Sequence, residues 1–192
     1  MASRWASSGP RWARASRGEP RALSFDHLHT GEKLVVEYFD AGRYQPDALN
    51  AVNHLLRDFR TGDVGSIDPA LLDLLHGLAV RTGSRRAFQV ISGYRSPATN
   101  EALHQRSSGV ATGSLHMRGQ AIDIRLADVQ LPVLRDAALA MRGGGVGFLI
   151  GLVNTVAGSA SLAGFTTTMH VHLDVEGLDM VGQHQRLLGD HD

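Results

Sequence analysis

The chain has 192 residues, of which 43% are hydrophobic and 20% are charged, and this is the composition of an ordinary globular domain. Its 19 basic and 19 acidic residues cancel, so the net charge gives no electrostatic case for a nucleic acid or an anionic membrane as partner. Because cysteine is absent, disulfides and thiolate metal sites are excluded, and a transition-metal site has to be built from His, Asp, Glu or water.

The first segment, MASRWASSGPRWARASRGEPRA, is rich in Arg and Ser, and its only acidic residue is Glu19. It contains no apolar core of the kind that a secretory signal needs, so no complete signal peptide is visible in this chain. We expect residues 1–21 to be a disordered or processed leader, with a transit peptide as the weaker alternative. No apolar run is long and uninterrupted enough to predict a membrane span.

The front of the body predicts a β-hairpin followed by two helices. Residues 22–44 contain two segments of alternating character on either side of a turn at residues 30–32. A helix begins near Pro46, because apolar residues then recur at helical spacing. After a break, Asp68 is the expected cap of a second helix that has proline at its first position.

The second half alternates strands and helices. The expected strands are residues 87–94, 121–126, 143–153 and 169–175, and the expected helices are residues 97–106 and 131–142. Residues 107–114 are rich in Gly, Ser and Thr and predict a flexible loop. This order of elements predicts an α+β fold, with a small antiparallel or mixed sheet and helices packed on one side. We expect residues 22–192 to form a single domain.

Two of these strands carry polar side chains on one face. Side chains alternate along a strand, so Asp123 lies opposite the apolar residues of the first strand. In the strand at MHVHLDV, the same alternation places His170, His172 and Asp174 on one face. His116 precedes the Asp123 strand by a tight turn and is close enough to fold over this polar face. If the two strands are neighbours, their polar faces merge.

An acidic residue on such a strand needs a partner, because burial of an unpaired carboxylate is costly. We predict that Asp123 binds a metal ion together with His116 and one histidine of the His170/His172 pair. A fourth position stays open for water, as in catalytic zinc sites, where the ion acidifies water and polarises a carbonyl for amide hydrolysis. The alternative is an ordinary solvated face, because isolated H-x₆-D and H-x-H patterns are common.

Four segments, ISGYRSPATN, SSGVATGSLHMRGQAIDIRL, LRDAALAMRGGGVGF and HVHLDV, together resemble the YcbK-like murein endopeptidases. These belong to the group of zinc D-Ala-D-Ala carboxypeptidases and their Hedgehog-like relatives. The resemblance covers residues 21–148 and 170–175, and its most specific part is S-x-H-x₂-G-x-A-x-D after S-G-Y-R-S. It implies a zinc metallopeptidase of that fold, which hydrolyses peptide bonds in peptidoglycan stem peptides or cross-links in the periplasm or cell envelope.

The same resemblance implies roles for individual residues. His116, Asp123 and His172 are the implied zinc ligands, and Arg95 is the implied stabiliser of the developing oxyanion. Arg95 is otherwise a structural cap of the strand-to-helix turn. His170 is the predicted general base, or else it orients substrate or is merely solvated.

Three neighbouring residues have supporting roles in this interpretation. Asp174 is either an acceptor for a ligand imidazole or a solvated carboxylate at a strand end. Ser114 and Gly119 are expected to set local geometry, with Gly119 permitting the turn that places His116.

One segment departs from the family pattern. Residues 148–169 form a long stretch of small residues, where the relatives have a short connection with aromatic residues and proline. This departure could displace the third ligand, so a second reading is a catalytically degenerate, metal-containing module that binds murein or a partner protein. A third reading is a metal-free structural domain. The sequence leaves open the oligomeric state and the bond that is cut.

Overall fold

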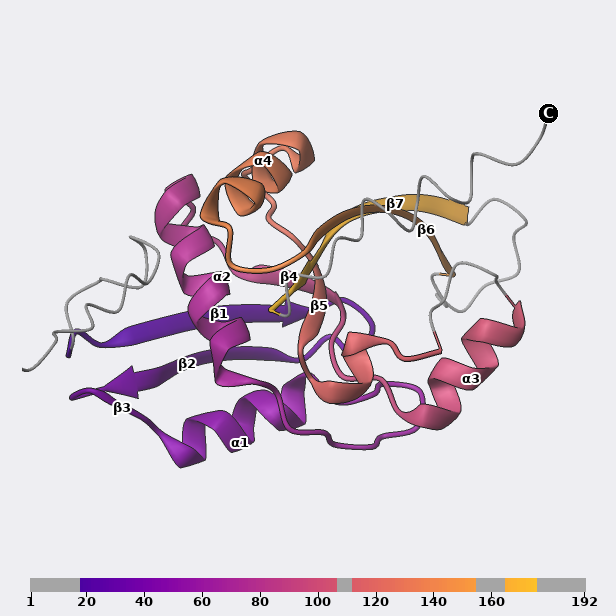
Figure 1. Ribbon diagram of the computed structural model, residues 1–192, viewed down its shortest axis with the longest axis horizontal. Helices are drawn as coiled ribbons and strands as arrows, with labels where there is room; N and C mark the ends of the chain where they lie inside the picture. Colours follow the sequence, from indigo (N-terminus) through magenta and orange to yellow (C-terminus); the bar gives the residue numbers. More distant parts are fainter. Residues whose placement is uncertain (1–17, 107–111, 155–164, 176–192) are drawn as a thin grey trace, which may run out of the picture.

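The computed structural model describes residues 18–106, 112–154 and 165–175, and only the backbone of residues 147–154 and 165–170. The described residues form a seven-stranded sheet in the order β3-β2-β1-β4-β5-β7-β6 (Figure 1). The strands are β1 (Arg21–His27), β2 (Lys33–Asp40), β3 (Arg43–Tyr44), β4 (Phe88–Ser92), β5 (Ala121–Arg125), β6 (Val146–Asn154) and β7 (Phe165–Asp174). The helices are α1 (Pro46–Leu55), α2 (Pro69–Thr82), α3 (Pro97–Arg106) and α4 (Leu131–Met141), with a 3₁₀ helix at Leu115–Arg118.

The sheet is mixed. Strand β1 pairs with β4 in parallel, and the other five neighbouring pairs are antiparallel. The predicted hairpin is the antiparallel pair of β1 and β2, which is joined by a turn at Gly31. The expected α+β fold with an antiparallel or mixed sheet is therefore confirmed.

The helices begin where caps and prolines predict. Helix α2 starts after Asp68, whose side chain accepts a hydrogen bond from the backbone N–H of Ala70 at 2.9 Å. Helix α3 follows Ser96, whose hydroxyl oxygen accepts from the backbone N–H of Thr99 at 3.2 Å. A proline stands in the first turn of α1, α2 and α4, where its missing N–H has no cost.

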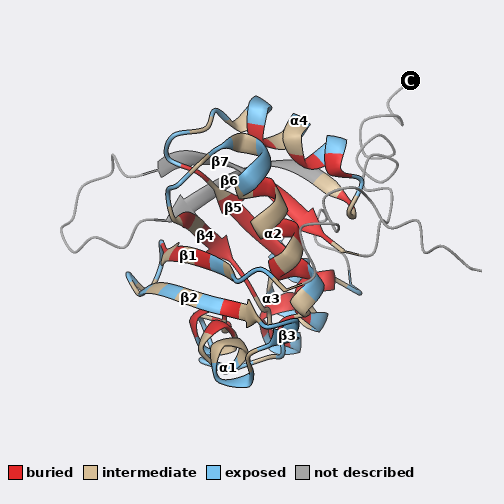
Figure 2. Cartoon of the chain, turned by 90° about the vertical axis from the view of Figure 1, so that its left-hand side faces the viewer, coloured by how far each residue is buried: buried red, intermediate tan, exposed pale blue. Residues whose placement is uncertain are grey.

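The hydrophobic core lies on one face of the sheet. Buried leucines of α2 and buried residues of α1 and α4 form one cluster with the alternate strand side chains that point to this face. On β5 these are Ile122 and Ile124, and on β7 they are Val171 and Leu173. Figure 2 shows the buried residues on the central strands and the inner sides of α2 and α4. Packing of helices on one side is thus confirmed for α1, α2 and α4, while α3 lies apart from them (Figure 1).

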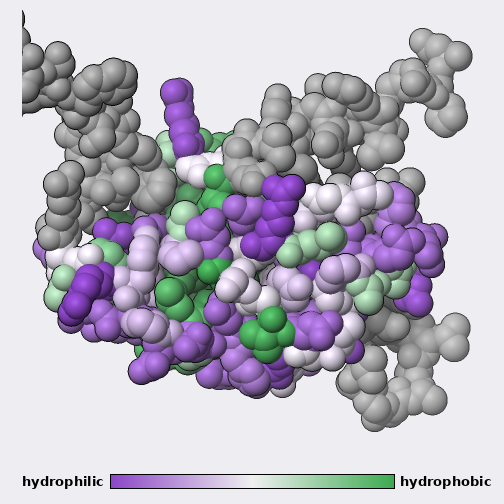
Figure 3. Space-filling view, turned by 60° about the horizontal axis from the view of Figure 1, so that its bottom comes forward, coloured by the Kyte–Doolittle hydropathy of each residue, from purple (hydrophilic) through white to green (hydrophobic). Residues whose placement is uncertain are grey.

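The molecular face that carries α1 is largely hydrophilic, with small and separate hydrophobic patches (Figure 3). Among the described helices, none has the length and apolar character needed to cross a membrane. At the front of the body, Arg21 already belongs to β1, and its guanidinium pairs with Asp73 at 2.7 Å. The rest of the expected leader, up to residue 17, and residues 107–111 of the expected loop lie outside the described residues.

Candidate metal centre

The pairing of β5 with β7 brings Asp123 and His172 together. In this antiparallel register Asp123 stands directly opposite His172, and the flanking pairs Ile122–Leu173 and Ile124–Val171 point into the core. The two polar faces therefore merge on the side of the sheet away from α1, α2 and α4. His172 therefore lies beside Asp123 despite the unusual connection that precedes it.

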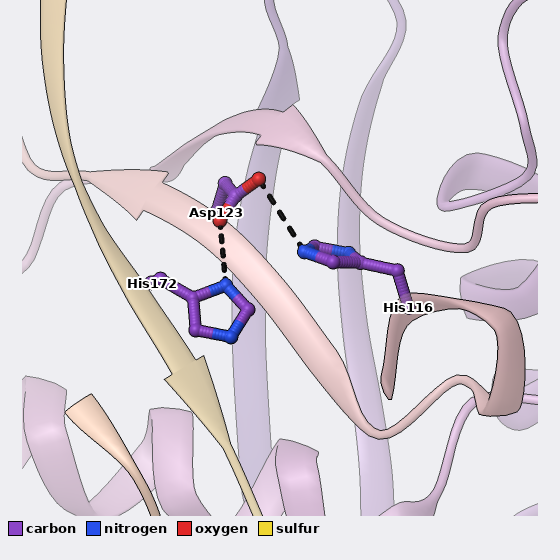
Figure 4. A group of neighbouring side chains, drawn as sticks. All are labelled: His116, Asp123 and His172. Carbon is purple, nitrogen blue, oxygen red and sulfur yellow. Dashed lines mark hydrogen bonds and ion pairs between the residues drawn. The ribbon is translucent and has the colours of Figure 1, made fainter. Parts of the chain in front are cut away.

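His116 completes a buried three-residue cluster (Figure 4). Asp123 Oδ1 lies 2.8 Å from His172 Nδ1, and Asp123 Oδ2 lies 3.4 Å from His116 Nε2. The three ligand atoms all lie within 4.8 Å of one another, and each residue is at most 5% exposed. Two ligands of a tetrahedral zinc ion are about 3.4 Å apart when each bond is about 2.1 Å. The donor set and its spacing thus fit one small divalent ion.

His116 is held by the backbone around it. Its Nδ1 lies 2.7 Å from the carbonyl oxygen of Gly93 at the end of β4, and this oxygen can only accept a hydrogen bond. The proton is therefore assigned to Nδ1, which leaves the Nε2 lone pair directed at Asp123. Such a second hydrogen bond is what fixes the orientation of a metal-binding histidine.

Gly119 ends the 3₁₀ helix that carries His116, with a φ of 66° in the left-handed region. A Cβ atom at this position would collide with the backbone carbonyl of Ser66. The N–H of Asp68 also donates to the Gly119 carbonyl at 2.9 Å, which ties the turn to the start of α2. Glycine is thus required by both conformation and space, in agreement with its expected role in placing His116.

The electrostatics favour the protonation states that metal binding needs. Burial alone would raise the pKa of Asp123, but the neighbouring His116 and His172 hold it well below its usual range. Burial lowers the pKa of His116, against the opposing effect of the Asp123 charge. The carboxylate is therefore ionised and the His116 imidazole neutral, as a divalent ion requires.

Asp174 lies next to the other nitrogen of His172. One carboxylate oxygen accepts from the backbone N–H of Gly145 at 2.9 Å, and the other lies 3.9 Å from His172 Nε2. Asp174 is fully buried, so the alternative prediction that it is a solvated carboxylate is wrong. The separation of 3.9 Å is longer than a hydrogen bond, so this pair is a buried electrostatic contact.

Arg95 lies beside the cluster, three residues after the end of β4. Its backbone N–H donates to the carbonyl of His116 at 3.1 Å, and its side chain donates to Asn100 Oδ1 at 3.3 Å. Burial lowers the pKa of Arg95, whereas the Asp123 charge raises it, so the guanidinium is within electrostatic reach of the cluster. Its Nε is buried and has no hydrogen-bond partner among the described residues.

The proposed base, His170, lies in β7 with its backbone opposite Leu149, but its side chain lies outside the described part of the structure. A different residue near the cluster was not anticipated. Asp58 is 1% exposed and accepts hydrogen bonds from the backbone N–H and hydroxyl of Ser96 at 2.9 and 2.8 Å. Burial would raise the pKa of Asp58, but hydrogen bonds from Thr99, Ser96 and Arg60 lower it. The only sequence signal is an isolated acid after the apolar face of α1.

Comparison with known proteins finds similar sequences. Residues 15–152 match the model of an M15 peptidase family described as peptidoglycan L,D-endopeptidase MepK. The peptidoglycan L,D-endopeptidase MepK of Escherichia coli K12 is 45% identical over 139 residues, which are 72% of this chain and 76% of that protein. A probable peptidoglycan L,D-endopeptidase MepK of Haemophilus influenzae is 39% identical over 137 residues, 71% of this chain and 74% of that protein. No solved structure matches the chain. His172 lies beyond the residues that the family model matches.

Proposed function

Since this chain belongs to the M15 peptidase family of peptidoglycan L,D-endopeptidases, we propose that it is a zinc enzyme that cleaves L,D cross-links of peptidoglycan. The chain is a metallopeptidase that hydrolyses peptide bonds in peptidoglycan, and it acts in cell-wall remodelling. The type of cross-link, the identity of the metal and the roles of single residues are the proposed parts. Because its substrate lies outside the cytoplasm, we also propose a periplasmic or envelope location.

The convergence of His116, Asp123 and His172 carries the proposal. Two neutral imidazoles and one carboxylate would hold a zinc ion with residual positive charge, a donor set that is typical of catalytic rather than structural sites. When bound, such an ion acidifies water and polarises a carbonyl. Other divalent ions accept the same ligands, so zinc is the first candidate and not the sole one to test.

The remaining steps are assigned to side chains around the cluster. The Arg95 guanidinium donates hydrogen bonds to the oxygen of the scissile carbonyl and stabilises the negative charge that develops there. His170 takes the proton of the attacking water and delivers it to the departing amine. Asp174 keeps the His172 ring oriented, since it lies beside Nε2.

The rival reading, a degenerate binding module, is not favoured. It depended on displacement of the third ligand by the long connection, whereas His172 Nδ1 lies 2.8 Å from Asp123 Oδ1. The relatives named above are also endopeptidases by name.

The test is digestion of purified peptidoglycan sacculi with the purified protein, followed by separation of the released muropeptides. We expect L,D-linked dimers to disappear, a chelator to stop the reaction, and added zinc to restore it. His116→Ala should abolish release, whereas His54→Ala, which removes an exposed histidine of α1, should leave it unchanged. Release that persists in His116→Ala after metal removal contradicts the metal mechanism, and loss of D,D-linked dimers alone contradicts the proposed bond. Elemental analysis of the purified protein identifies the metal.

A further inference from the structure

Arg60 follows helix α1, and its guanidinium lies on an aromatic ring. Its guanidinium carbon lies 4.2 Å from the centroid of the Phe59 ring. The same ring stacks on His29, with centroids 4.1 Å apart and an angle of 8° between the planes, and it meets His27 edge-on. A guanidinium laid against a ring loses little side-chain freedom when it binds a ligand, because its orientation is already set.

Hydrogen bonds fix this segment to the loop that carries Arg95. Asp58 Oδ1 accepts from the backbone N–H of Arg60 at 3.0 Å, and Asp58 Oδ2 accepts from the backbone N–H of Ser96 at 2.9 Å. The N–H of Tyr94 also donates to the carbonyl of Leu56 at 2.7 Å. A single buried carboxylate therefore bridges the two loops, one residue away from Arg95.

Arg60 has an acidic neighbour but no ion-pair partner among the described residues. Burial lowers the pKa of Arg60, whereas the nearby Asp58 charge raises it. Arg60 forms no ion pair with any residue that the structure describes, although Arg57, three residues earlier, pairs with Glu32 at 2.9 Å. Arg60 is close enough to Arg95 to lower the pKa of that second guanidinium. Two positive charges held near each other repel, and a bound anion relieves this repulsion. The pair, of which Arg60 is exposed, therefore favours an anionic ligand.

We propose that Arg60 is a substrate-binding residue that holds a free carboxylate of the peptide substrate next to the scissile bond. This inference rests on the proposed function, because peptidoglycan peptides are the ligands that it concerns. Their chain ends and side chains carry free carboxylates, and the planar guanidinium binds such a group through two parallel hydrogen bonds. Since the chain has a net charge of 0, attraction of an anionic peptide has to be local, and Arg60 supplies it.

The test compares two forms of one substrate, a cross-linked peptide dimer purified from peptidoglycan, with its carboxylates either free or converted to amides. Metal-loaded wild type, Arg60→Gln and Arg60→Lys are assayed together with Arg43→Gln, a control that removes an exposed arginine at the far edge strand β3. With free carboxylates, we expect Arg60→Gln to raise KM at least about tenfold with kcat nearly unchanged, and Arg60→Lys to be intermediate. With the amidated dimer, wild type and Arg60→Gln should have equal KM.

Two results overturn the inference: an unchanged KM in Arg60→Gln, or an equal loss on both substrates, which would indicate a structural role. Calorimetric binding of the free-carboxylate dimer separates this inference from the proposed function. If wild type cleaves no dimer but binds it and Arg60→Gln does not, the carboxylate site stands and the proposed activity fails. If both proteins bind the dimer equally, the carboxylate site is refuted whatever the activity.

Discussion

His27, at the end of β1, is expected to limit the stability of this protein in acid. It is fully buried, and its Nδ1 accepts hydrogen bonds from the backbone N–H groups of His29 and Thr30, both at 3.3 Å. Burial, reinforced by the nearby His29, lowers the pKa of His27 from 6.5 to about 4. The imidazole is thus neutral in the folded protein at pH values where it would be charged in the unfolded chain.

The sign and size of the effect follow from this difference in pKa. As the pH falls below 6.5, the unfolded chain takes up the proton first, so the free energy of unfolding decreases until the pH reaches about 4. One pKa unit corresponds to about 1.4 kcal/mol, so His27 alone removes roughly 2.5 kcal/mol between about pH 7.5 and about pH 4.5. This is a large fraction of the stability of a typical domain.

The assay is urea unfolding at these two pH values for wild type and His27→Asn, with a chelator present so that metal release does not contribute. The Asn carboxamide oxygen takes the place of Nδ1 as acceptor and does not titrate. We expect the loss of stability on acidification to be smaller by roughly 2.5 kcal/mol in His27→Asn than in wild type. The exposed His54→Asn should behave as wild type. An equal acid loss in wild type and His27→Asn would refute the reasoning.

Three further substitutions test the supports of the cluster. Gly119→Ala should reduce the free energy of unfolding by several kcal/mol, because its methyl group collides with the Ser66 carbonyl at a positive φ. The control Gly62→Ala, at a φ of 81° in open space, should cost only about 1 kcal/mol. Equal losses in urea unfolding would contradict this prediction. Asp58→Ala should cost about 3 kcal/mol, because it leaves buried donors without an acceptor, and an unchanged unfolding midpoint would argue against a bridging role. Asp174→Asn should weaken zinc binding by about 10–100-fold in calorimetry, and unaltered affinity would remove Asp174 from the site.

Strand periodicity was sufficient to predict which residues share a face. In any sheet, neighbouring side chains along a strand point to opposite sides, so the polar positions at Asp123 and His172 followed from the apolar residues beside them. That the two strands are neighbours, with these two residues in register, did not follow. Register depends on contacts between segments 49 residues apart, which no local pattern encodes.

Contacts between distant loops account for what was missed. Asp58 acts through Ser96, which is 38 residues away, and the carbonyl of Gly93 orients His116 over 23 residues. A backbone carbonyl has no sequence signature, and an isolated acid after a helix is usually solvated. Both the position of His116 before its strand and the family resemblance indicated this residue, but neither explained how it is held. The assigned roles of Arg95 and His170 stay predictions.

The ladder between β6 and β7 has a consequence for how this enzyme family can diverge. His172 pairs with Gly147 near the beginning of β6, whereas the two strands open toward their connection at Asn154 and Phe165, seven rungs away. Insertions and deletions in that connection lie next to the Asn154–Phe165 pair, at the opposite end of the ladder from the Gly147–His172 pair. We therefore expect changes in the length of this connection to leave the position of His172 beside Asp123 unchanged.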